Sequence, residues 1–137
     1  VRTSWVIGDG NNFVRTMASL ADKGVSPSVV GDQYGRLTFT TDLAAGIVQL
    51  ISADAPSGTY NLTNTGPTQS WADIAKRVFE LRGRSADDVT EVTTAAYFAD
   101  KPGMAPRPTH STLDLTKLTA AGFEPAPADD RLRKYLA

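Results

Sequence analysis

Hydrophobic residues recur at helical spacing in five segments of the chain, and most of these segments carry a start or stop signal. The first predicted helix is capped by Asn11 or Asn12, and the second begins with Asp42 as its N-cap. The third starts at Ser70, where Ser-Trp-Ala-Asp has the form of a capping box. A shorter helix is predicted over 113–121, and a last one lies at the C-terminal end. In the second helix Leu43, Ile47, Leu50 and Ile51 follow Asp42 at helical spacing.

Short segments between these helices have the alternating or β-branched residues of strands. They cover 1–7, 25–30, 59–63 and 89–93. In the central stretch Leu37 and Phe39 alternate with Arg36, Thr38 and Thr40, which predicts one more half-buried strand. The polar face of this strand either lines a site for an anionic ligand or is simply solvated. Together the segments predict an α/β fold of short strands with four to five helices.

The composition is that of one soluble globular domain. The 137 residues are 41% hydrophobic and 21% charged, with a formal net charge of −1, so broad electrostatic capture of nucleic acid or of a membrane surface is not expected. The chain has no cysteine, which excludes disulfides and thiolate metal sites and fits a cytoplasmic location. No apolar run reaches the roughly 20 residues that span a bilayer.

The chain begins directly in a strand-like run, which reads Val-Arg-Thr-Ser-Trp-Val-Ile over residues 1–7. A strand needs neighbours to pair its backbone groups, and its apolar side chains need cover. We therefore expect residues 1–137 to be one domain of a longer protein. Residues 1–8 are predicted to be a strand of a sheet whose remainder lies outside this chain.

Few residues offer chemistry, and those that do indicate anion recognition rather than catalysis. His110 is the only histidine, and no Ser/His/Asp set or metal cluster can be assembled. A glycine turn at 8–10 precedes the helix start at Asn12, where free amides and the helix dipole can hold a phosphate. Arg36 and Arg107, the latter between two prolines, carry the planar fork that suits a diphosphate. The alternatives are a hydrated helix end and ordinary surface arginines.

Several motifs occur in an order that resembles a known family. They are Val-Arg-Thr-Ser-Trp-Val at 1–6, Gly-Asn-Asn-Phe-Val-Arg-Thr-Met at 10–17, Asp-Gln-Tyr-Gly at 32–35, Asp-Leu-Ala at 42–44, Gly-Thr-Tyr-Asn-Leu at 58–62 and Arg-Pro-x-x-Ser-x-Leu-Asp at 107–114. The set is similar to the C-terminal part of the dTDP-4-dehydrorhamnose reductase family, within the extended short-chain dehydrogenase/reductase (SDR) superfamily. The likeness covers almost the whole chain. It implies the C-terminal substrate-binding portion of an extended SDR (Rossmann-type) enzyme, with the Rossmann core absent.

The resemblance also implies roles for individual residues. The helix start and the arginines would meet the diphosphate of a sugar nucleotide, and the first strand would lie near the nicotinamide and the sugar. The implied substrate-binding residues are Asn12, Phe13 through its backbone amide, Arg36, Arg107 and Trp5, and the implied cofactor-binding residues are Thr3 and Ser4. For Trp5 the alternative is a buried strand tryptophan.

The chain departs from the family pattern at several positions. Leu37 stands where proline is expected, and Ile7 where tyrosine is common. The turn at 8–10 lacks the third glycine of a dinucleotide loop. Tyr97-x-x-x-Lys101 matches the catalytic pair of the superfamily formally, but it falls in a proline-flanked loop, and we interpret it as coincidence. We expect no catalytic residue in this chain.

The function implied by the resemblance belongs to the intact protein. It would pass hydride from NADPH or NADH to the C4 ketone of dTDP-4-dehydro-L-rhamnose, giving dTDP-L-rhamnose, while this chain holds the nucleotide sugar. The implied partners are the dTDP-sugar and the missing N-terminal Rossmann domain, and homo-oligomerisation is open. The alternatives are another extended SDR reductase or epimerase, and a non-catalytic regulatory relative. The chain alone is expected to be inactive.

Overall fold

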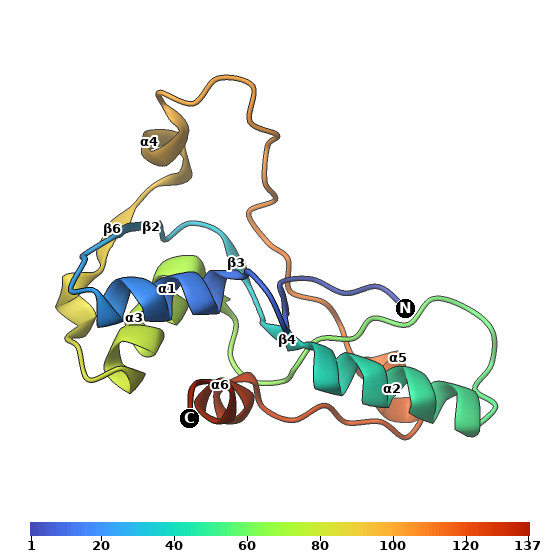
Figure 1. Cartoon of the computed structure of the whole chain (residues 1–137). Helices are drawn as coiled ribbons and strands as arrows, with labels where there is room; N and C mark the ends of the chain where they lie inside the picture. Colours follow the sequence, from blue (N-terminus) through green and yellow to red (C-terminus); the bar gives the residue numbers. More distant parts are fainter.

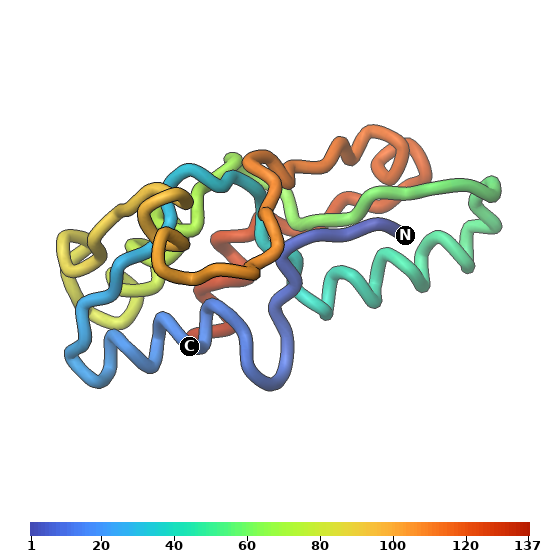
Figure 2. The backbone as a smooth tube through the Cα atoms, turned by 90° about the horizontal axis from the view of Figure 1, so that it is seen from above, coloured from blue at the N-terminus to red at the C-terminus, as the bar shows by residue number.

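The computed structural model describes residues 1–137 and shows an elongated molecule, with α1 and α3 toward one end and α2 at the other (Figures 1 and 2). The helices are α1 (Phe13–Asp22), α2 (Thr40–Ser52), α3 (Trp71–Leu81), α4 (Thr94–Phe98), α5 (Thr116–Ala120) and α6 (Ala128–Leu136), with a 3-10 turn at Ala86–Asp88. The strands are β1 (Val6–Ile7), β2 (Ser28–Val30), β3 (Tyr34–Gly35), β4 (Thr38–Phe39), β5 (Gln69–Ser70) and β6 (Thr90–Val92). The predicted α/β class of short strands and helices is confirmed.

The strands form three separate pairs rather than one sheet. β1 pairs with β4 and β2 with β6, both in parallel, whereas β3 and β5 are antiparallel. The run at 1–7 is a strand only over its last two residues, and Arg2 adds a single parallel bridge to Asn61. The predicted strand at 59–63 is likewise reduced to that bridge.

The core lies between α1, α3, β2 and α6. Helix α3 begins with the predicted capping box, in which the Ser70 hydroxyl accepts from the backbone N–H of Asp73 at 3.0 Å and the Asp73 carboxylate accepts from that of Ser70 at 2.9 Å. Its inward positions include Val78 and Phe79, which are fully buried. On α1 the N-cap at Asn12 is also confirmed, because its side chain accepts from the backbone N–H of Arg15 at 3.0 Å.

Asp42 is not the N-cap of α2, contrary to the sequence-based expectation. The helix begins two residues earlier, after Phe39, and Asp42 lies in its first turn. Its carboxylate is 4% exposed and accepts from Nε and Nη2 of Arg131 in α6, at 2.7 and 2.9 Å. Burial raises the pKa of Asp42, but hydrogen bonding with Arg131 and Asn64 and the charge of Arg131 outweigh it and lower the pKa. The residue therefore joins two helices.

The apolar residues at helical spacing in α2 are not all buried, since Leu43 and Leu50 are only half-buried. Ile47 and Ile51 are exposed, the latter at 75%, whereas Gly46 is buried. A Cβ at Gly46 would overlap Leu62 and would lie 3.0 Å from Phe123. The absence of a side chain lets these two residues approach the helix, and the part of the apolar stripe at Ile47 and Ile51 is left exposed.

The polar face of the central strand is not solvated as a whole. Thr38 is fully buried, and its hydroxyl donates to the carbonyl of Ser4 at 2.7 Å. Thr40 is already the first residue of α2. Only Arg36 remains available as a partly buried cation on this stretch.

Candidate functional site

One cavity of about 660 Å³ gathers residues from distant parts of the chain. It lies between the N-terminal segment, α1, β2, α3, α4 and the segment that leads away from α4. Four of the residues singled out by the sequence line it, namely Ser4, Trp5, Phe13 and Arg107. Thr3, Asn12 and Arg36 do not.

An aromatic group forms one wall of the cavity. The indole of Trp5 stacks on Trp71, with ring centroids 3.8 Å apart and planes inclined by 19°, and Phe13 lies 4.5 Å from Trp71. Trp5 has a positive φ of 50°, a conformation that costs a non-glycine residue energy and is enriched at functional sites. Gly35 makes room for it, since a Cβ there would come within 2.8 Å of the indole. Trp71 is half-buried and lines the cavity.

Ser4 connects the N-terminal segment to the segment that follows Arg107. Its hydroxyl donates to the carbonyl of Ser111 at 3.1 Å, and its own carbonyl accepts from Thr38. The Ser4 hydroxyl therefore lies at the edge of the cavity in a fixed position. Thr3 is exposed and its side chain makes no hydrogen bond.

A long segment arches from α4 back to the body of the molecule (Figure 1), and its residues include Arg107 by their numbering. The residues just after it are held to β3, because Tyr34 donates its N–H to Thr109 and accepts from the N–H of Ser111, both at 2.7 Å. The imidazole of His110 stacks on the Tyr34 ring at 5.5 Å. Arg107 itself is exposed and makes no hydrogen bond or ion pair within the chain, so its guanidinium can meet an anion.

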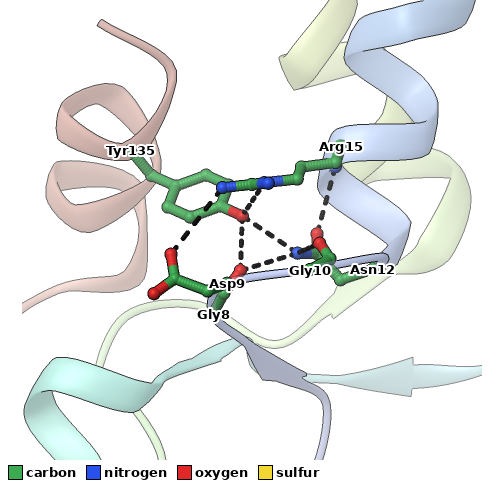
Figure 3. Close-up of polar contacts among 6 residues, drawn as sticks. All are labelled: Gly8, Asp9, Gly10, Asn12, Arg15 and Tyr135. Atoms are coloured by element: carbon green, nitrogen blue, oxygen red, sulfur yellow. Dashed lines mark hydrogen bonds and ion pairs between the residues drawn. The ribbon is translucent and has the colours of Figure 1, made fainter.

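The side chain of Asn12 is already committed to the protein, as Figure 3 shows. Its amide nitrogen lies 2.9 Å from the Gly8 carbonyl and 2.9 Å from the Tyr135 hydroxyl, while its oxygen caps α1. The Tyr135 hydroxyl donates to Gly8 at 2.6 Å and accepts from Nε of Arg15 at 2.7 Å. These bonds fix the turn that precedes α1, and they leave Asn12 outside the lining of the cavity.

Arg36 lies in a separate hollow, which it shares with residues 112–116 and with part of α5. Its Nη1 is 3.5 Å from the Leu113 carbonyl, and its Nε is buried without a partner. The structure therefore does not bring Arg36 and Arg107 into one cavity. A diphosphate role for Arg36 remains a prediction from the resemblance.

Sequence reasoning missed Gln33, Tyr97 and Phe98 in the lining of the cavity. Gln33 was quoted only as part of the motif at 32–35, and Tyr97 was expected in a loop but lies in the short helix α4. The Lys101 ammonium lies 3.6 Å from the centroid of the Tyr97 ring. The two residues of the formal Tyr-x-x-x-Lys match therefore form a cation–π contact with each other. The signal for α4 was Thr93, whose hydroxyl accepts from the backbone N–H of Ala96 at 3.1 Å.

No cluster of three or more His, Asp or Glu side chains is placed to bind a metal ion. None of the helices combines the length and the apolar character that crossing a bilayer requires. The polar chemistry of the cavity thus comes from Ser4, Gln33, Arg107 and a few hydroxyls.

The chain is similar in sequence to several known proteins. The chain is 38% identical over 137 residues to the spore coat polysaccharide biosynthesis protein SpsK of Bacillus subtilis, with 99% of this chain and 46% of that protein covered. It is 37% identical to the dTDP-4-dehydrorhamnose reductase of Aggregatibacter actinomycetemcomitans, over 100% of this chain and 49% of that protein. A probable dTDP-4,6-dihydroxy-2-methyloxan-3-one 4-ketoreductase of Streptomyces antibioticus is 36% identical to it, over 91% of this chain and 41% of that protein. The chain spans about half the length of these relatives.

Among solved structures, the dTDP-4-dehydrorhamnose reductase of Bacillus anthracis in complex with NADP superposes with a TM-score of 0.83 at 34% identity. The superposition covers 98% of this chain and 46% of that one. The family model described as the RmlD substrate binding domain matches residues 1–137. The chain therefore belongs to the RmlD substrate-binding domain family.

Proposed function

We propose that this chain provides the nucleotide-sugar site of an NADPH-dependent reductase that converts dTDP-4-dehydro-L-rhamnose to dTDP-L-rhamnose. The observation that carries the proposal is the single cavity in which Ser4, Trp5, Phe13 and Arg107 meet. The resemblance implies substrate or cofactor contacts for all four. A volume of about 660 Å³ also falls within the range of roughly 300–1,000 Å³ that is usual for small-molecule sites.

The residues of the cavity suit the parts of a nucleotide sugar. The unpaired guanidinium of Arg107 can donate two parallel hydrogen bonds to a diphosphate. A lysine ammonium cannot donate such a pair from one planar group. The stacked indoles of Trp5 and Trp71 offer a flat apolar surface to the C–H face and methyl group of a deoxysugar. At the start of α1, the backbone amide of Phe13 can serve the anion, while Asn12 shapes the turn through its own hydrogen bonds.

The cofactor would supply the hydride, and this chain would contribute little to holding it. Ser4 has its hydroxyl at the edge of the cavity, and Thr3 has an exposed hydroxyl beside it, so both fit contacts at the nicotinamide end. The turn at 8–10 does not fit a dinucleotide loop, since it lacks the third glycine of that motif. The NADP-bound relative supports NADPH as the cofactor.

The rest of the intact protein would supply the dinucleotide site, the proton donor and cover for apolar surface. Val1 is 55% exposed, and the outward stripe of α2 includes Ile47, Val48 and Ile51, exposed at 39%, 61% and 75%. Residue 2 pairs with residue 61 in parallel, and parallel strands are normally buried on both faces. We propose that a Rossmann sheet continues from the N-terminal segment and packs against α2.

A second candidate is a reductase of the same class with a different dTDP-4-keto sugar, which the ketoreductase relative supports. The test is NADPH oxidation by the intact protein with dTDP-4-dehydro-L-rhamnose and, in parallel, with dTDP-4-keto-6-deoxy-D-glucose. Turnover that favours the first sugar supports the proposal, and turnover that favours the second selects the alternative. Binding of dTDP without turnover of any keto sugar would indicate a non-catalytic regulatory relative instead.

A further inference from the structure

The cavity contains one buried amide that the proposed contacts with sugar and diphosphate do not use. Gln33 is only 7% exposed and lines the cavity, close to β2 and α4. Its Nε2 donates to the hydroxyl of Thr94, at the start of α4, at 3.0 Å. A buried amide that faces a cavity has a donor and an acceptor to satisfy, so its orientation decides what the cavity can recognise.

A chain of hydrogen bonds fixes that orientation. The Thr94 hydroxyl donates to Oδ1 of Asp32 at 2.6 Å, and the same oxygen accepts from the backbone N–H of Thr94 at 2.8 Å. The hydrogen bond from the Thr94 side chain lowers the pKa of Asp32, so its carboxylate is an acceptor only. Since Thr94 spends its single hydroxyl proton on Asp32, its oxygen must accept from Gln33. The nitrogen of Gln33 therefore faces Thr94.

The oxygen of Gln33 is the end that remains for a ligand. Oε1 accepts no hydrogen bond from the protein, and it is not among the atoms that are sealed off without a partner. Because the residue is 93% buried and lines the cavity, the accessible part of its amide faces the cavity. This is a fixed, uncharged acceptor in a largely apolar setting.

The surfaces beside Gln33 suit a flat ring. The same cavity is lined by Val29 and Val30 of β2 and by Tyr97 and Phe98 of α4, and α4 packs against β2. Aromatic and β-branched side chains stack well on a planar heterocycle, and a neutral amide is the usual partner for the edge of a base. The ring that fits an acceptor must carry an N–H in its own plane.

We propose that Gln33 recognises the base of the nucleotide sugar, with Oε1 accepting a hydrogen bond from the N3–H of a thymine ring. This inference rests on the proposed function and deepens it, because it assigns the base end of the same site. Thr94 and Asp32 act as positioning residues, since Thr94 bonds the amide, Asp32 bonds Thr94, and neither lines the cavity.

The experiment compares dTDP with its N3-methyl derivative, which lacks the N–H, by calorimetry on the intact protein. With the unmutated protein, methylation at N3 should weaken binding about 2- to 10-fold, because a neutral hydrogen bond contributes about 0.5–1.5 kcal/mol. Gln33→Met keeps the length of the side chain and removes the acceptor. This variant should lose about 2- to 10-fold in affinity for dTDP and should no longer discriminate against the methylated ligand.

Two controls separate a base contact from a general disturbance of the site. Binding of inorganic pyrophosphate should be unchanged in Gln33→Met, because its contacts lie at Arg107 and not at the base. Thr94→Val, which frees the amide without altering the lining, should reduce the discrimination only in part.

Equal binding of dTDP and its N3-methyl derivative by the unmutated protein would overturn the inference, and this result needs no variant to fold. Discrimination that persists in Gln33→Met would overturn it as well, while the proposed function would stand because dTDP is bound. A protein that binds neither ligand would remove the proposed function together with the inference.

Discussion

Replacing Asp42 by asparagine tests the link between α2 and α6. The variant keeps the shape of the side chain but removes the charge from a carboxylate that is 4% exposed and bound twice by Arg131. A hydrogen bond to a charged group contributes about 1.5–3 kcal/mol, and breaking a fully buried ion pair costs about 3–5 kcal/mol. Arg131 is 33% exposed and can regain water, so the expected loss of unfolding free energy is ~2–3 kcal/mol.

The difference between the two proteins should depend on pH in one direction. The folded pKa of Asp42 lies below its ordinary value, whereas the unfolded chain has a pKa of about 3.9. Stability from a lowered pKa is fully present above the unfolded value and is lost as the pH falls through the folded one. The other carboxylates titrate in both proteins, so their contributions cancel in the difference between the two unfolding free energies. The gap should thus be largest at neutral pH and should close on acidification below about 3.9.

The assay is urea denaturation of both proteins across the acid range, followed by tryptophan fluorescence. Arg131→Met and the double variant complete a cycle that isolates the pairwise energy from other effects of each substitution. A loss below about 0.5 kcal/mol, as for an ordinary surface change, would refute the buried pair. A gap that does not change with pH would refute the role of the charge.

Three further predictions concern packing, binding and activity. Gly46→Ala should destabilise the protein by about 1–3 kcal/mol in urea denaturation, although alanine favours helices, because the methyl group would overlap Leu62; a stabilised variant would contradict this packing of α2. Arg107→Ala in the intact protein should weaken dTDP binding by about 1.5–3 kcal/mol, and an unchanged calorimetric affinity would exclude the diphosphate contact. The 137-residue chain alone should not oxidise NADPH with dTDP-4-dehydro-L-rhamnose and should self-associate through its exposed N-terminal segment; turnover, or a strictly monomeric chain by sedimentation, would count against this.

Local signals in the sequence were sufficient where the stabilising contacts are themselves local. In the capping box at Ser70 and in the cap at Asn12, the side chain bonds a backbone N–H only three residues further along the chain. The starts of α1 and α3 could therefore be predicted from the sequence. Positive φ at Gly24 and Gly83 likewise follows from the preference of glycine just beyond a helix.

Contacts between distant residues explain the features that could not be predicted. Asp42 has the sequence context of an N-cap, but its partner Arg131 lies 89 positions away. The stripe that includes Ile51 indicates an inward face, yet the buried side of α2 is decided by Leu62 and Phe123, which fit only against Gly46. For the cavity, the resemblance supplied Trp5 and Arg107, while periodicity alone could not single out a glutamine whose role depends on two other side chains.

The contact between Tyr135 and Gly8 has a consequence for how the protein is made. It joins residues 127 positions apart, and the same hydroxyl holds Asn12 and Arg15 at the start of α1 (Figure 3). On the ribosome, the turn before α1 leaves the exit tunnel long before the tyrosine that secures it. Until residue 135 has been synthesised, that turn has only the local hydrogen bonds from the Asn12 side chain to the carbonyls of Gly8 and Gly10. The slow formation that is typical of contacts between distant residues therefore applies to the turn that precedes α1.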